Sequence, residues 1–62
     1  MSKNTLTVIE VADLLGVSTT TIYALVRERT IPFFRIRNRI FFRLESINDW
    51  IAQLEGTAVN NQ

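Results

Sequence analysis

The 62-residue chain has room for only one small domain, because single hydrophobic cores usually belong to domains of roughly 100–150 residues. It has no cysteine and no histidine, which excludes disulfides, thiolate or imidazole zinc sites and the catalytic pairs that need either residue. With 47% hydrophobic residues and a net charge of +1, the composition is that of a folded domain. The carboxylate pairs Glu10/Asp13 and Glu45/Asp49 have no histidine and no third oxygen ligand beside them, so we expect a protein that is not an enzyme and holds no metal or cofactor.

The charge is unevenly distributed along the chain. Residues 27–43 hold six arginines and one glutamate, a net charge of +5, whereas the rest holds one lysine and five carboxylates, a net charge of −4. Such a basic segment attracts an anionic partner even when the total charge is small. The longest apolar run, Ile22–Val26, is too short for a membrane span or a signal peptide. We therefore expect a cytoplasmic protein without membrane association.

A first helix is predicted over residues 8–15. Thr7 and Glu10 have the spacing of a capping box, and Gly16 is suited to end the helix. Apolar residues recur at helical spacing and predict a buried stripe made of Val8, Val11, Ala12 and Leu15. Residues 1–4 and 56–62 are polar and are predicted to be flexible tails on either side of one domain, residues 5–55.

A second helix is predicted over residues 19–29, with Ser18 as its N-cap and Pro32 blocking any continuation. Its inward residues are Ile22, Leu25 and Val26. Only residues 16–18 connect the two helices, and so short a link favours the steep crossing of a helix-turn-helix. That motif needs a small residue where the helices cross, a glycine that opens the turn and a branched apolar residue of the second helix that fills the gap. Ala12, Gly16 and Ile22 stand at these positions. The flanking positions expected in the core are Val11, Leu15, Val17 and Leu25. The alternative is a generic pair of packed helices.

Residues 33–43 alternate apolar and arginine residues in part, which predicts a β-hairpin. A three-residue loop at 37–39, with Asn38 in the left-handed conformation, would pair Ile36 with Ile40 and Phe34 with Phe42. The opposite face would then hold Phe33, Arg35, Phe41 and Arg43. A two-residue loop at 37–38 would place Ile36 beside Arg39, and we expect it less.

The last element is predicted to be a helix over residues 44–55 that stops before Gly56. Its inward stripe is Ile47, Trp50, Ile51 and Leu54, which makes Trp50 a core residue and not a stacking platform for nucleic acid. The fold class is therefore mainly α with a small β-hairpin: a winged helix-turn-helix with a two-stranded wing and a C-terminal helix.

The order of parts resembles the excisionase family of DNA-binding domains, small winged helix-turn-helix proteins related to the MerR group. The resemblance lies in L-T-V-I-E-V-A-D-L-L-G-V-S-T-T-T-I-Y, then I-P-F-F-R-I, R-I-F-F-R and I-N-D-W-I, and it covers about residues 5–54. It implies that the second helix enters the major groove of DNA and that the wing lies on the backbone or in the adjacent minor groove. Many members have a glycine where Arg37 stands in the wing turn.

Candidate DNA contacts follow from the residues left outside the predicted core. On the second helix these are Thr19, Thr20, Tyr23, Ala24 and Arg27, whose hydroxyl, methyl and guanidinium groups can contact base edges or phosphates. Ser18 is better explained as a cap. On the wing and its flank the candidates are Arg35, Arg37, Asn38, Arg39 and Arg43. These arginines would otherwise only keep an edge strand soluble, but their crowding beside the helix favours phosphate binding.

Three functions are compatible with these features. The first is an excisionase, a factor that binds and bends double-stranded DNA near recombination sites and assists an integrase. The second is a small MerR-like transcriptional regulator, which needs the same kind of site-specific binding. The third is a protein-interaction module such as an antirepressor, docking through exposed Phe33 and Phe41. For the first two we expect a monomer that associates with further copies on neighbouring DNA sites.

Overall fold

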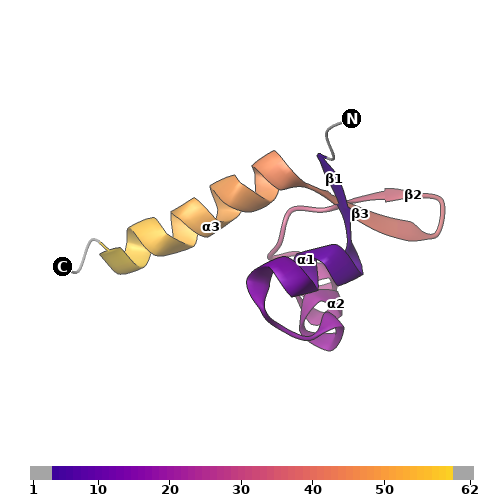
Figure 1. Cartoon of the computed structure of the whole chain (residues 1–62), viewed down its shortest axis with the longest axis horizontal. Helices are drawn as coiled ribbons and strands as arrows, with labels where there is room; N and C mark the ends of the chain where they lie inside the picture. Colours follow the sequence, from indigo (N-terminus) through magenta and orange to yellow (C-terminus); the bar gives the residue numbers. More distant parts are fainter. Residues whose placement is uncertain (1–3, 60–62) are drawn as a thin grey trace.

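The computed structural model describes the backbone of residues 4–59 and the side chains of residues 4–56. It has the winged helix-turn-helix architecture that the sequence predicts, with one additional strand (Figure 1). The elements in chain order are β1 (Thr5–Thr7), α1 (Val8–Leu15), α2 (Thr19–Glu28), β2 (Phe34–Ile36), β3 (Arg39–Arg43) and α3 (Leu44–Val59). We refer to β2, β3 and the turn between them as the wing. Of the predicted tails, residues 1–3 and 60–62 lie outside the described residues.

The predicted ends of α1 are confirmed. The Glu10 N–H donates to Thr7 Oγ1 over 3.3 Å, and the Thr7 N–H donates to Glu10 Oε1 over 2.9 Å, which completes the capping box. At the other end Gly16 has φ 72°, and the N–H groups of Gly16 and Val17 donate to the carbonyls of Asp13 and Ala12. This pair of hydrogen bonds is a Schellman motif, which requires the left-handed conformation that glycine adopts without strain.

The ends of α2 repeat this arrangement with one difference. Ser18 Oγ accepts from the Thr21 N–H over 3.2 Å, as expected of an N-cap. The helix ends at Glu28 and not at Arg29, because Arg29 has φ 59° and its N–H donates to the Val26 carbonyl. With the Thr30 N–H donating to the Leu25 carbonyl, this is a second Schellman motif, and it has arginine in the left-handed position. The chain bends by 108° between α1 and α2, which confirms the predicted steep crossing.

The sheet has three antiparallel strands in the order β1-β3-β2. The sequence prediction missed β1, whose residues pair Thr5 with Arg43, Leu6 with Phe42 and Thr7 with Phe41. Beyond its end, the Leu44 N–H donates to the Asn4 carbonyl over 2.8 Å. Because β1 runs directly into α1 and β3 directly into α3, the helix-turn-helix and the sheet share their junctions without linkers.

The predicted hairpin register is wrong. The structure pairs Phe34 with Phe41, Arg35 with Ile40 and Ile36 with Arg39, so the turn has two residues and the alternative that the sequence disfavoured is the one adopted. Arg37, with φ 57°, takes the left-handed conformation that we expected of Asn38. The two phenylalanines stack on the outer face of the sheet, with ring centroids 5.9 Å apart. Phe42, Ile40 and Arg35 therefore share the inner face.

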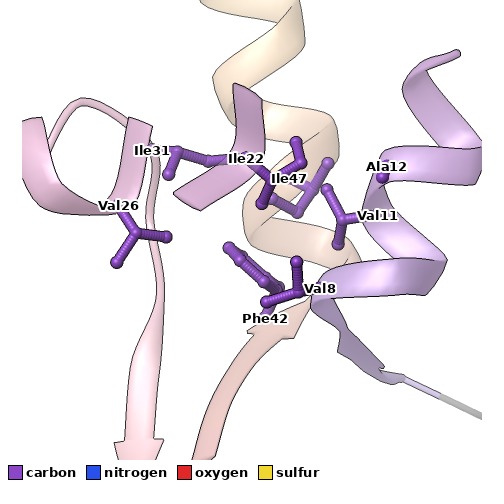
Figure 2. Packing of buried hydrophobic residues seen from close by; sticks show 8 residues of the cluster. All are labelled: Val8, Val11, Ala12, Ile22, Val26, Ile31, Phe42 and Ile47. Carbon is purple, nitrogen blue, oxygen red and sulfur yellow. The ribbon is translucent and has the colours of Figure 1, made fainter. Parts of the chain in front are cut away.

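One hydrophobic core joins all the helices to the sheet (Figure 2). Its members are Val8, Val11, Ala12, Ile22, Val26, Ile31, Phe42 and Ile47. Leu15 and Leu25 pack against this core while partly exposed, as do Trp50 and Ile51. Two residues predicted to be buried are exposed, Val17 by 41% and Leu54 by 54%, because the turn and the distal half of α3 project away from the other elements. Ile31, which follows α2, is a core residue that sequence reasoning missed.

The predicted end of α3 is also wrong, because the helix continues through Gly56 to Val59. Glycine costs only about 1 kcal/mol inside a helix, which is not enough to stop one. The helix extends to the side of the molecule opposite the wing tip (Figure 1). Within the described part of the chain, no helix alone is long and apolar enough to cross a membrane, and α1 and α2 reach that length only as a bent pair.

Candidate nucleic-acid interface

The exposed side of α2 carries the predicted contact residues of this helix. Its inward side is fixed by Ile22 and Val26, both buried. Thr20, Tyr23 and Arg27 follow one another at helical spacing on the opposite side, and all three are exposed, Tyr23 by 49%. Thr19 is exposed at the start of the helix, and Ala24 is half-buried. The helix therefore presents a hydroxyl, a phenol and a guanidinium group side by side.

The end of α2 and the inner face of the wing border an open hollow of about 660 Å³, which we call the arginine hollow. The corrected register brings Arg35 to it, because Arg35 pairs with Ile40 on the inner face of the sheet. The residues that line the hollow are Tyr23, Val26, Arg27, Arg29, Phe33, Arg35 and Ile40. Arg29 is a residue that the sequence analysis counted in the basic segment but did not place in the site.

A second, smaller hollow of about 260 Å³ lies on the other side of Tyr23. It joins the start of α1 to the tip of the wing, and it brings the predicted contacts Asn38 and Arg39 close to the α2 face. Its lining residues are Thr7, Val8, Ile9, Tyr23, Asn38, Arg39 and Ile40. Tyr23 and Ile40 line both hollows, so the exposed face of α2 and the wing form one continuous surface.

The wing arginines differ in their surroundings. Arg39 lies over the outer face of the sheet, with its guanidinium carbon 5.2 Å from the centroid of the Phe41 ring, a cation–π contact. Arg37 is exposed at the tip. Arg43 is at the far end of β3, where its Nη2 lies 3.5 Å from Glu45 Oε1 with both side chains well exposed. The structure does not bring Arg43 to either hollow, and so exposed an ion pair contributes little to stability.

Three arginines line the arginine hollow. Among the described residues, the guanidinium groups of Arg27, Arg29 and Arg35 make no hydrogen bond or ion pair, and no carboxylate lines the hollow. Unpaired guanidinium groups around one concave surface attract anions and fit phosphate oxygens bidentately. The interface therefore combines side chains that can read base edges with a site suited to a phosphate.

The aromatic docking surface that we considered from the sequence is less exposed than expected. Phe33 and Phe41 are both half-buried, Phe33 against the core and Phe41 in its stack with Phe34. The large apolar residues that are most exposed lie elsewhere, among them Ile9 at 71% and Ile36 at 56%. An interaction through exposed Phe33 and Phe41 therefore loses its main argument.

A comparison with known protein families supports the same conclusion as the geometry. The family model described as a helix-turn-helix domain matches residues 5–55, from the first residue of β1 to the last turns of α3. The chain belongs to this helix-turn-helix domain family. Membership supports sequence-specific DNA binding, and the family is one of DNA-binding and not of catalytic domains. No curated protein and no solved structure shows a significant match to the chain.

Proposed function

We propose that this helix-turn-helix protein binds a specific site in duplex DNA with α2 in the major groove and the wing on the phosphate backbone. The observation that carries the proposal is the continuous surface formed by the exposed face of α2 and the wing, which meet at Tyr23 and Ile40. An α-helix fits the major groove, and a flanking basic wing can then reach the adjacent backbone. Both elements can therefore face one duplex at the same time.

The two sets of side chains have different roles in this proposal. Thr19, Thr20, Tyr23 and Ala24 face base edges, where their hydroxyl and methyl groups discriminate between base pairs, and Arg27 can donate two hydrogen bonds to guanine. Arg35, Arg37 and Arg39, with Asn38 at the tip, position the duplex through its phosphates. Arg43 stays a weaker candidate because Glu45 already lies beside it.

The test compares a cognate site with random duplex DNA. Footprinting of the DNA that flanks the gene supplies the site. Arg27→Ala and Tyr23→Ala should each weaken cognate binding more than random binding, because one good bidentate base contact is worth about 1–3 kcal/mol of discrimination. On duplexes too short to hold a second copy, Asn48→Asp is the matched control for Arg27→Ala, since it lowers the net charge equally from an exposed position on α3. Equal losses on both DNAs would refute base reading by α2.

We further propose that the biological role is that of an excisionase, a factor that binds and bends DNA near recombination sites and assists an integrase. This role rests on the resemblance of residues 5–54 to that family, and it places the protein in the cytoplasm with its DNA. If an integrase is encoded beside the gene, adding the protein to that integrase should raise excision of a substrate that carries the footprinted site. Regulation of a promoter reporter without any effect on excision would instead favour a small MerR-like regulator.

Assembly on DNA follows from the size of the domain. A single module of this kind buries only about 600–1,000 Å² of protein surface on DNA, which favours the use of several copies. Residues 44–59 carry three carboxylates and no basic residue, so the α3 surface is complementary in charge to the basic side of a neighbouring copy. We expect a monomer by sedimentation without DNA and cooperative binding to DNA with several sites. Equal affinity per site on DNA with one and with several sites would refute the assembly.

A further inference from the structure

Arg29 has a backbone conformation that is unusual for an arginine, with φ 59°. Both α1 and α2 end in a Schellman motif, with Gly16 in the left-handed position of the first and Arg29 in that of the second. An L side chain is strained in this conformation, whereas glycine adopts it freely. The protein therefore keeps an arginine at a position where glycine would suit the fold better, and a strained residue of this kind often marks a functional position.

The surroundings of Arg29 indicate what the side chain is for. Arg29 lines the arginine hollow together with Arg27 and Arg35, and none of the three guanidinium groups has an anionic partner among the described residues. The hollow is open and its volume of about 660 Å³ is within the range of small-ligand sites, so a phosphodiester group has room there.

A helix C-terminus normally repels anions, because its last carbonyls carry partial negative charge. At the end of α2 two of these carbonyls are occupied. The Leu25 carbonyl accepts from the Thr30 N–H over 3.1 Å, and the Val26 carbonyl accepts from the Arg29 N–H over 3.0 Å. Three full positive charges therefore outweigh what remains of the helix dipole at this position.

We propose that the arginine hollow is a binding site for one backbone phosphate of duplex DNA, at the point where one DNA strand passes from α2 to the wing. Arg29 and Arg35 hold the phosphate, and Arg27 lies between this site and the base edges. This inference rests on the proposed DNA binding and adds a defined phosphate site with Arg29 as one of its ligands.

The test measures the salt dependence of binding to a random-sequence duplex. Each phosphate contact contributes about 0.9 to the slope of log K against log salt, which corresponds to about a 3.5-fold change in affinity between 50 and 200 mM salt. Because Arg29 and Arg35 hold the same phosphate, the double variant Arg29→Gly/Arg35→Gln should lower the slope by about 0.9, and each single variant should lower it by part of that amount. On a duplex too short to hold a second copy, where contacts through α3 do not contribute, Arg29→Lys, which keeps the charge, and Asn48→Asp, which has the net charge of Arg29→Gly, should keep the wild-type slope.

Thermal unfolding separates binding from folding. Because glycine suits the left-handed position, Arg29→Gly should unfold at the same temperature as wild type or up to about 5 °C higher, while binding DNA more weakly. Weaker binding accompanied by a lower Tm would make Arg29 a structural residue and would overturn the proposal. If the wild-type protein binds DNA but Arg29→Gly and Arg35→Gln leave the salt slope unchanged, the phosphate site is overturned and the proposed DNA binding is not.

A second measurement does not depend on DNA. Titration with inorganic pyrophosphate, followed by the NMR signals of the arginine Nε–Hε groups, should shift Arg27, Arg29 and Arg35 more than Arg43. If the wild-type protein fails to bind duplex DNA, the proposed function is refuted whatever this titration shows. Equal shifts for all the arginines would mean that pyrophosphate does not prefer the arginine hollow over other arginines, and this result would also overturn the site.

Discussion

Two glycines give opposite predictions for the same substitution. Gly16 has φ 72° between α1 and α2, whereas Gly56 lies within α3. Apart from the adjacent residues and the backbone of the same helix, a Cβ added at either position would have no heavy atom within 4 Å, so neither alanine would clash with another part of the fold. An L residue in the left-handed conformation destabilises the folded state by roughly 1–2 kcal/mol. Alanine also lowers the conformational entropy of the unfolded chain, which offsets about 0.4–1 kcal/mol of that cost. We therefore expect Gly16→Ala to lower the free energy of unfolding by about 1 kcal/mol.

Gly56→Ala should act in the other direction. Alanine is favoured over glycine inside a helix by about 1 kcal/mol, and we expect about half of this because Gly56 is in the last turns of α3. In a domain of this size 1 kcal/mol corresponds to about 4–8 °C in Tm, so the two variants should melt about 6–12 °C apart, on either side of wild type. Circular dichroism at 222 nm during heating measures both. Shifts of the same sign would refute the conformational argument.

Three further substitutions test the fold and the wing. Thr7→Ala removes the hydroxyl that accepts from the Glu10 N–H, and in urea titrations it should cost about 1 kcal/mol, with Thr7→Ser close to wild type. Ile22→Val should cost about 0.5–1.5 kcal/mol because Ile22 is fully buried, whereas Ile9→Val at a residue 71% exposed should cost less than about 0.5 kcal/mol. Arg37→Gly should lower the salt slope on random duplex by about 0.9 and leave Tm unchanged or higher, since φ is 57°; a lower Tm would contradict this.

The helix-turn-helix was predictable because its signals are local. The capping box of Thr7 and Glu10, the glycine that ends α1 and the cap at Ser18 each depend on hydrogen bonds between residues three to five positions apart. Such contacts form in the same way in most tertiary contexts. The predicted inward residues Ile22 and Val26 follow from the same short-range periodicity.

The sheet was less predictable because its pairing is not local. Thr5–Thr7 is too short to show a convincing strand pattern, and its partner lies near the other end of the domain. In the hairpin, pairing Ile36 with Ile40 gave the cleaner apolar pattern, but the structure stacks Phe34 on Phe41 and accepts a left-handed arginine in the turn. Because side chains alternate along a strand, this change of register moved Ile40 and Phe42 to the face of Arg35.

The candidate site was also predictable only in part. The exposed residues of α2 that are candidates for DNA contact could be predicted from the helical wheel, since only the buried stripe had to be removed. The arginine hollow could not, because it needs the conformation of Arg29 and the register that turns Arg35 inward. An arginine directly after the last helical residue, where glycine is usual, was the one signal in the sequence that could have pointed to it.

The pairing of β1 with β3 also has a consequence for how the protein is made. Thr5 and its partner Arg43 are 38 positions apart, so at translation rates of about 5–20 residues per second β1 waits roughly 2–8 s for the strand it pairs with. During that interval α1 and α2 have emerged without Phe42, and their apolar sides are uncovered. We expect no stable intermediate on the ribosome, only a single late folding step once β3 has been released and the sheet closes over the helices.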